Sequence, residues 1–163
     1  MKSTKSNLSS TWINRIKVQG YQNYSDQQIA ELAFGNRFAY QLCTACLFVG
    51  VLLCNIPILG TMMGIAFLGV VLSNHPFDYI YNYFLVTRMN KPQLPARSKQ
   101  LKFACLNATF MIGATIYFAQ NNMMTIASIL GYTLVGVAFL VATTDFCIPS
   151  VIYNVTIGKL FKD

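Results

Sequence analysis

The fold of this chain is decided by two uncharged apolar stretches, FAYQLCTACLFVGVLLCNIPILGTMMGIAFLGVVLSNHPF (residues 38–77) and FACLNATFMIGATIYFAQNNMMTIASILGYTLVGVAFLVATT (residues 103–144). A helix that spans a bilayer needs about 20 predominantly apolar residues. Each stretch is therefore too long for one crossing and long enough for two, which predicts a pair of helical hairpins. The predicted crossings are residues 37–55, 58–74, 102–119 and 123–143.

The composition agrees with an all-α integral membrane protein. The chain is 55% hydrophobic and 10% charged, whereas soluble domains carry about 25% charged residues. A net charge of +7 would suggest nucleic acid in a soluble domain, but here the basic residues flank the apolar stretches and no nucleic-acid partner is predicted. No charged residue lies inside either stretch, so a proton relay or a voltage sensor is unsupported.

The basic residues also predict the orientation. Five Lys/Arg lie in residues 1–37, five in 74–102 and two in 145–163, with none in the connections 55–60 and 120–122. Short loops rich in Lys and Arg stay in the cytoplasm. We therefore expect both termini and the central loop to be cytoplasmic, and residues 1–30 contain no apolar run typical of a cleaved secretory signal.

Three units follow from these spans: an N-terminal segment at 1–36, a transmembrane domain at 37–155 and a tail at 156–163. Trp12 and its apolar neighbours favour either a segment at the lipid headgroups or a disordered tail, and both alternatives stay open. Ser25 and Gln28 form a capping-box pattern that starts a short lead-in helix. Gly35-Asn36 is expected to end that helix before the first crossing.

The segment between the hairpins has its own helical pattern. Apolar residues recur at helical spacing over 76–89, with Pro76 and Asp78 suited to a first turn. We interpret it as an amphipathic helix on the cytoplasmic interface, although it could also prolong the second crossing. Pairs of small residues four positions apart are expected to let helices approach closely: these are Gly60/Gly64, Thr109/Gly113 and Ala127/Gly131.

The two halves of the chain resemble each other. Arg37-Phe38-Ala39 opens the first hairpin and Lys102-Phe103-Ala104 opens the second. Ile80-Tyr81-Asn82 follows the first hairpin and Ile152-Tyr153-Asn154 follows the second. Since each unit has two crossings, the repeats must share one orientation, with an axis along the membrane normal. His75 and Cys147 then correspond.

Cys147 is the candidate catalytic residue. Pro149 suits the start of a new helix, and a thiol just before a helix N-terminus can ionise more easily, whereas Asp145 opposes this effect. A thiol at this position could face water, but the favoured interpretation is an inert buried cysteine. Cys43 and Cys46 have redox-motif spacing but lie inside a crossing, which favours ordinary packing.

Other polar residues at the cytoplasmic ends are candidates for binding. Asp78 could orient or charge the imidazole of His75, or both residues could cap the following helix, which is the favoured interpretation. Arg37, Arg97 and Lys102 could attract an anionic partner. Cys105 could approach the other thiols if the helices form a bundle, but no ligand spacing typical of a metal site is present and no metal or other cofactor is predicted.

Several motifs carry a family resemblance: Arg37-Phe38 before the first crossing, Ser73-Asn74-His75-Pro76 after the second, Pro95 to Phe103-Ala104 before the third, and Asp145-Phe146-Cys147-Ile148-Pro149-Ser150 after the fourth. Together they resemble domain-of-unknown-function family 4395, small four-crossing proteins of the bacterial inner membrane, over residues 37–155. The resemblance implies thiol or sulfur chemistry, because the family often has a pair of cysteines two residues apart after the last crossing. Here Ser150 stands in place of the second.

Two functions are compatible with the sequence. The preferred one is a non-catalytic scaffold or accessory subunit of a membrane assembly, as a homo-oligomer or part of a larger complex in the lipid bilayer. The alternative is a membrane thiol protein in which Cys147, with Ser150 beside it, handles sulfur or redox equivalents at the cytoplasmic face. Its partner would be a soluble thiol or sulfur-carrier protein.

Overall fold

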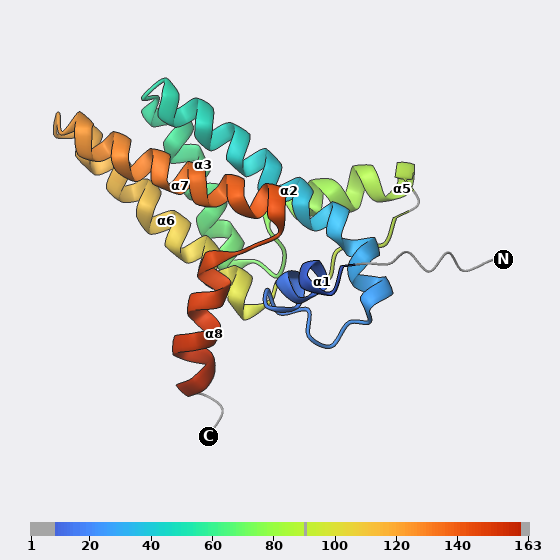
Figure 1. Cartoon of the computed structure of the whole chain (residues 1–163). Coiled ribbons are helices and arrows are strands. Elements are labelled where there is room, and N and C mark those ends of the chain that lie inside the picture. Colours follow the sequence, from blue (N-terminus) through green and yellow to red (C-terminus); the bar gives the residue numbers. More distant parts are fainter. Residues whose placement is uncertain (1–8, 90, 161–163) are drawn as a thin grey trace.

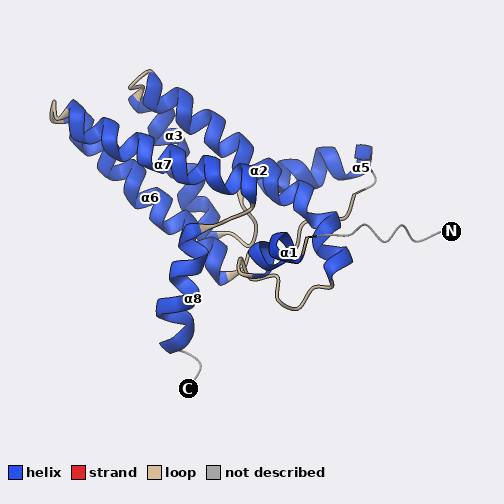
Figure 2. Cartoon of the chain, in the orientation of Figure 1, coloured by secondary structure: helices blue, strands red, loops and turns tan. Residues whose placement is uncertain are grey.

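The computed structural model describes residues 9–89 and 91–160, which contain helices and no strands (Figures 1 and 2). In chain order the helices are α1 (Ser10–Lys17), α2 (Asp26–Leu52), α3 (Ile56–Val71), α4 (Pro76–Ile80), the π-helix η1 (Tyr81–Leu85), α5 (Val86–Met89), α6 (Lys99–Gln120), α7 (Met124–Thr144) and α8 (Ile148–Leu160). The predicted all-α class is confirmed. The predicted tail at 156–163 is helical as far as Leu160, and residues 1–8 and 161–163 of the two predicted terminal segments lie outside the described residues.

Four long helices form a bundle. α3 packs against α6, α2 packs against α7, and the two hairpin partners pack against each other in both α2/α3 and α6/α7. Figure 1 shows the two tight hairpin turns at one end of the bundle, whereas α1, α5 and α8 lie at the opposite end. The N-terminal helix, the central segment and the C-terminal helix are thus gathered at a single end.

Two to three helices are long and apolar enough to span a membrane. α6 and α7 each meet this requirement alone. α3 meets it only together with the segment Pro76–Met89, from which it is bent by 81°. The predicted helix at 76–89 is therefore confirmed as α4, η1 and α5, and the bend excludes a straight prolongation of α3.

The expected helix break at Gly35-Asn36 is wrong. The capping box forms as predicted, with the Ser25 side chain accepting from the Gln28 N–H, but α2 then runs unbroken to Leu52. Glycine inside a helix costs about 1 kcal/mol, and tertiary contacts offset this cost here. A Cβ on Gly35 would lie 2.6 Å from the Tyr81 ring, and Asn36 donates a hydrogen bond to Gln19 Oε1 at 3.2 Å.

The described part of the N-terminal segment packs on the protein, which neither sequence interpretation expected. Ile13 and Ile16 of α1 are buried in a cluster with Ile29 and Leu32 of α2. The Trp12 indole N–H donates to the buried Asp145 carboxylate at 2.6 Å. The apolar side chains of α1 thus contact the end of the helix bundle.

The small residues have unequal roles. A Cβ on Gly131 would lie 2.9 Å from Val51, so this glycine does permit close contact between α7 and α2. Gly60 and Gly64 face open space, since a Cβ added to either would meet no atom within 4 Å. The close-packing prediction is therefore wrong for the Gly60/Gly64 pair, because that face of α3 points away from the other helices.

The Tyr81 hydroxyl yields a stability prediction. Its ring packs against Phe34 and Phe38 at centroid distances of 6.3 and 6.0 Å, but its buried hydroxyl has no hydrogen-bond partner among the described residues. A buried unpaired polar group costs about 1–3 kcal/mol. We expect Tyr81→Phe to raise the free energy of unfolding by about 1 kcal/mol, as measured by unfolding in detergent.

Tyr81→Ala is the matched control. It removes the ring as well as the hydroxyl, so it should lower the free energy of unfolding by about 3–5 kcal/mol. A marked destabilisation by Tyr81→Phe would contradict the prediction and show that the hydroxyl has a partner.

Candidate functional site: a thiol cavity inside the bundle

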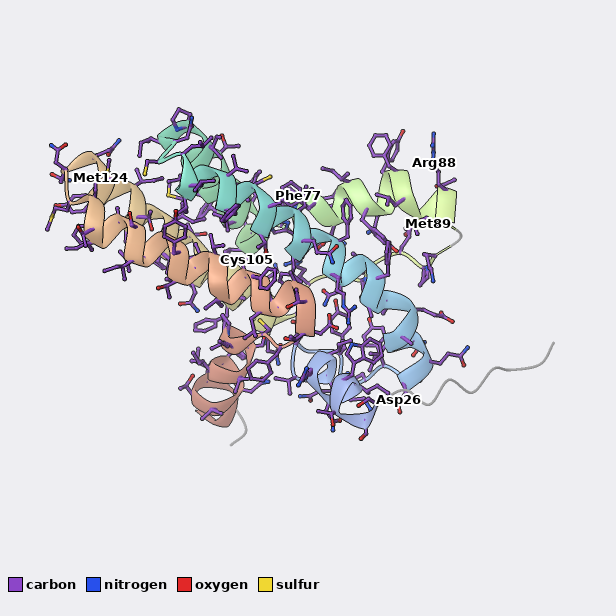
Figure 3. The ribbon with its side chains drawn as sticks, turned by 45° about the horizontal axis from the view of Figure 1, so that its top comes forward. Asp26, Phe77, Arg88, Met89, Cys105 and Met124 are labelled. Atoms are coloured by element: carbon purple, nitrogen blue, oxygen red, sulfur yellow. The ribbon has the colours of Figure 1, made fainter. Side chains whose placement is uncertain are left out.

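The four long helices enclose a cavity of about 120 Å³. Its walls are mainly apolar side chains, among them Leu47, Met62, Ala66, Ile112 and Leu134. Its polar lining residues, which define what we call the thiol cavity, are Tyr40, Cys43, His75, Arg97, Cys105, Asn107 and Cys147. Figure 3 places Cys105 between Met124 at the hairpin-turn end and Asp26 at the opposite end.

A buried ion pair fixes one side of the cavity. Arg97 donates from Nε to Asp78 Oδ2 at 2.6 Å and from Nη2 to Oδ1 at 3.0 Å, and the exposed fractions of the two side chains are 5% and 2%. The backbone N–H of Arg97 donates to Ser73 O at 2.7 Å, which joins the segment between α5 and α6 to the end of α3. Burial works against the charged guanidinium, but Asp78 outweighs it and raises the pKa of Arg97 well above its usual value.

The remaining guanidinium nitrogen of Arg97 points to a thiol. Nη1 lies 3.7 Å from Cys105 Sγ, within hydrogen-bonding range for sulfur. The guanidinium carbon also lies 5.7 Å from the centroid of the Tyr40 ring. Because hydrogen bonds from a cation are stronger than those from a neutral donor, Arg97 can stabilise an anionic sulfur at Cys105.

His75 is held in one tautomer. It precedes α4, where its ring Nδ1 accepts from the backbone N–H of Phe77 at 3.3 Å. The backbone N–H of His75 donates to Asp78 Oδ2 at 3.0 Å. This confirms the favoured interpretation that His75 and Asp78 cap the helix. With Nδ1 accepting, Nε2 carries the proton, and it lies 4.0 Å from Cys43 Sγ.

The imidazole of His75 is also kept neutral. Burial, followed by the nearby Arg97 charge, lowers its pKa from 6.5 to about 4 despite the opposing effect of Asp78. His75 therefore acts as a hydrogen-bond donor towards the cavity at neutral pH. In this tautomer it cannot remove a proton from Cys43 through Nε2.

Cys147 directly precedes α8, as predicted, and it is buried. Its exposed fraction is 4%, which agrees with the favoured interpretation of a buried thiol and not with a water-facing one. Burial raises the pKa of Cys147, and the Ser150 hydroxyl, which donates to Sγ at 3.1 Å, offsets part of this effect. Cys147 also lines a second pocket of about 450 Å³ beside Arg15 and Phe146. Its side chain thus lies between a surface pocket and the thiol cavity.

Two predicted binding residues lie apart from the cavity. Arg37 donates from Nε to the Asp145 carboxylate at 2.8 and 2.9 Å and makes a further contact through Nη2. Asp145 is completely buried and adopts a left-handed conformation with φ of 56°. Lys102 is half-buried on α6 and does not line the cavity. The structure therefore assigns Arg37 to an anchor at the end of α7.

Sequence reasoning missed how the thiols are distributed. Cys43 and Cys46 were expected to be ordinary packing residues; Cys43 lines the cavity, but Cys46 does not. Cys54 is exposed beside the first hairpin turn. Cys105 lines the cavity together with Cys43 and Cys147, in agreement with the expectation that it could approach the other thiols in a helix bundle. Within residues 9–89 and 91–160, no three His, Cys, Asp or Glu side chains are placed to hold a metal ion.

The fold and this cavity define a class: a small helical protein with two to three helices suited to span a membrane and a buried cluster of thiols, one imidazole and one guanidinium. The chain belongs to the family described as Domain of unknown function (DUF4395), whose family model matches residues 34–157. That range contains all residues of the thiol cavity. No curated protein and no solved structure matches the chain.

The lowered pKa of His75 makes stability depend on pH. The imidazole takes up a proton near pH 6.5 when unfolded but near pH 4 when folded. The stability from the neutral histidine is therefore fully present above about pH 6.5 and is lost as the pH falls towards 4. We expect His75→Asn, which retains a helix-capping side chain, to reduce this loss by about 3 kcal/mol, as measured by unfolding in detergent at both pH values. If the free energies of unfolding of wild type and variant differ by the same amount at both pH values, the lowered pKa of His75 is contradicted.

The Ser150 hydroxyl yields a second prediction. Because its hydrogen bond favours the thiolate of Cys147, Ser150→Ala should slow alkylation of Cys147 by iodoacetamide about tenfold. Rates can be followed by peptide mass spectrometry. Thr156→Ala is a control on the same helix, since the Thr156 hydroxyl donates only to Ile152 O. Equal rates in both variants would show that Ser150 does not influence the thiol.

Proposed function

We propose that this protein is a membrane thiol protein that exchanges redox equivalents with a soluble thiol partner through Cys147 and Cys105. The observation that carries the proposal is the thiol cavity, in which sulfurs from α2, α6 and the start of α8 share one space with Arg97 and His75. Ser150 replaces the second cysteine often found in the family. Cys105, across the same cavity, provides the second thiol in our proposal.

The positions of the two thiols suggest separate roles. Cys147 lines the surface pocket and the cavity, so a partner sulfur can reach it from outside the bundle. Cys105 receives a hydrogen bond from Arg97, which offsets part of the cost of forming a thiolate in this buried position. In the exchange, the partner's two thiols are oxidised to a disulfide while a Cys105–Cys147 disulfide is reduced, so both electrons and both protons pass to the two cysteines.

We further propose that all four long helices cross a bacterial inner membrane, with both termini and the thiol cavity's polar end on the cytoplasmic side. The one-sided Lys/Arg distribution supports this orientation. Equivalent contacts support two parallel repeats: the Phe38 and Tyr81 rings lie 6.0 Å apart, and those of Phe103 and Tyr153 lie 5.5 Å apart. In both halves, therefore, an aromatic ring from the first helix packs on the helix that follows the hairpin.

A scaffold or accessory role is the second candidate. The segment Pro76–Met89 exposes Tyr79, Tyr83 and Phe84, whose aromatic side chains suit a membrane interface or a contact with another subunit. A stable homo-oligomer or larger complex after purification in mild detergent, together with unreactive cavity thiols, would favour this function over thiol exchange.

The thiol function can be tested in intact membranes with the soluble aromatic disulfide dithiodipyridine. Wild-type protein should release pyridine-thione and lose two hydrogen atoms by intact mass as Cys105 and Cys147 join. Cys147→Ser should abolish the fast release, because the thiol nearest the surface pocket is gone. Cys46→Ser is the matched control and should react like the wild type, since Cys46 does not line the cavity.

If Cys147→Ser reacts as fast as the wild type, Cys147 is not the exchanging thiol. Peptide mapping should place the new disulfide between Cys105 and Cys147. A disulfide to Cys43 instead would reject the assigned pair.

A further inference from the structure

We propose that the thiol cavity binds the head group of a lipid-soluble quinone, which oxidises the Cys105 and Cys147 thiols. This inference rests on the proposed thiol function and names the second substrate of the same site. Four features of the cavity support it: its access, its charge, its polar groups and its size.

Access to the cavity is from the side of the bundle. The lining residues Ala104 and Asn107 of α6, and Val137 and Ala138 of α7, are partly exposed. The cavity therefore reaches the surface along α6 and α7, the two helices that are each apolar and long enough to span a membrane. A ligand entering there comes from the hydrocarbon interior, so it must be soluble in lipid.

The charge of the site favours a neutral ligand. Arg97 is paired through two nitrogens with Asp78, and His75 is neutral at pH 7. The cavity therefore carries no net positive charge, and most of its wall is apolar. An inorganic anion such as sulfate would lose its hydration without a compensating counter-charge, which is unfavourable.

The polar lining suits carbonyl acceptors beside a ring. Arg97 directs Nη1 towards Cys105, and the Asn107 amide, which donates to Phe103 O at 3.3 Å, has a second N–H available. Tyr40 adds an aromatic ring to the same wall, whereas its hydroxyl donates to Gln19 Oε1 at 3.5 Å. These donors can bind the carbonyl oxygens of a quinone while the apolar walls contact its ring.

The size of the cavity also agrees. Its 120 Å³ is about ten times the space that one water molecule needs on the same measure. One ring-sized head group can therefore be accommodated, with an apolar chain extending between α6 and α7 into the bilayer.

The reaction is balanced by the two thiols and the quinone alone. Cys105 and Cys147 each lose a proton, and a new S–S bond forms between their sulfurs. The two electrons and two protons pass to the quinone, whose carbonyl oxygens become the hydroxyls of a hydroquinone. The disulfide is then reduced by the soluble thiol partner, which completes a cycle from that partner to the membrane quinone.

Decylubiquinone is a suitable probe for the purified, reduced full-length protein in phospholipid nanodiscs without oxygen. We expect the quinone absorbance to fall as the protein loses two hydrogen atoms by intact mass. Cys105→Ser and Cys147→Ser should each abolish the reaction, whereas Cys54→Ser should react like the wild type because Cys54 is exposed near the hairpin turn.

A cavity-filling variant tests the location of the quinone. Ala138→Phe should weaken decylubiquinone binding about tenfold, because a larger side chain overfills the cavity. Gly136→Phe is the matched control on the same helix: it faces open space and should bind the quinone like the wild type. The free energy of unfolding in detergent should be close to the wild-type value for both variants, which verifies that each protein is folded.

The failures of the two proposals are distinguishable. Reaction with dithiodipyridine without binding or reduction of decylubiquinone would overturn the quinone inference and leave the thiol function intact. Equal quinone reduction by Ala138→Phe and wild type would also overturn it. A phospholipid acyl chain that occupies the cavity and is not displaced by decylubiquinone would likewise reject it. Loss of both reactions in the wild type would reject both proposals.

Discussion

The arrangement of the polar residues at one end of the thiol cavity depends on the buried ion pair between Arg97 and Asp78. This pair joins the central linker to the first turn of α4, and Asp78 also accepts the His75 N–H. It brings a guanidinium to Cys105 while leaving the cavity without net charge. Removing one partner of a buried pair typically costs about 3–5 kcal/mol because the other charge is left uncompensated. One interaction thus connects stability of the fold to the chemistry of the site.

A second buried carboxylate positions Cys147. Asp145 accepts from Arg37 of α2 and Trp12 of α1, while Gln19 donates to its carbonyl at 2.7 Å. These contacts hold the turn between α7 and α8. The left-handed conformation of Asp145 redirects the chain at this turn. The N-terminal helix is therefore part of the support for the thiol, although it precedes the region matched by the family model.

Under the proposed repeat, corresponding positions of the two halves carry different side chains beside the cavity. His75 corresponds to Cys147, and Asp78 corresponds to Ser150. In the first half the side chains cap a helix and pair with Arg97, whereas in the second half a hydroxyl donates to a thiol. If the repeat holds, equivalent positions carry an ion pair in one half and a candidate nucleophile in the other.

The sequence by itself determined the helical class, the capping box at Ser25 and the helix at 76–89, because these depend on apolar content and on contacts between residues a few positions apart. Only the tertiary structure decided that α2 continues through Gly35, that Cys147 is buried and that Cys105 lines its cavity. Those outcomes depend on contacts between distant residues, such as Trp12 with Asp145. Local spacing carries no information about such contacts, since they form only when the helices have packed.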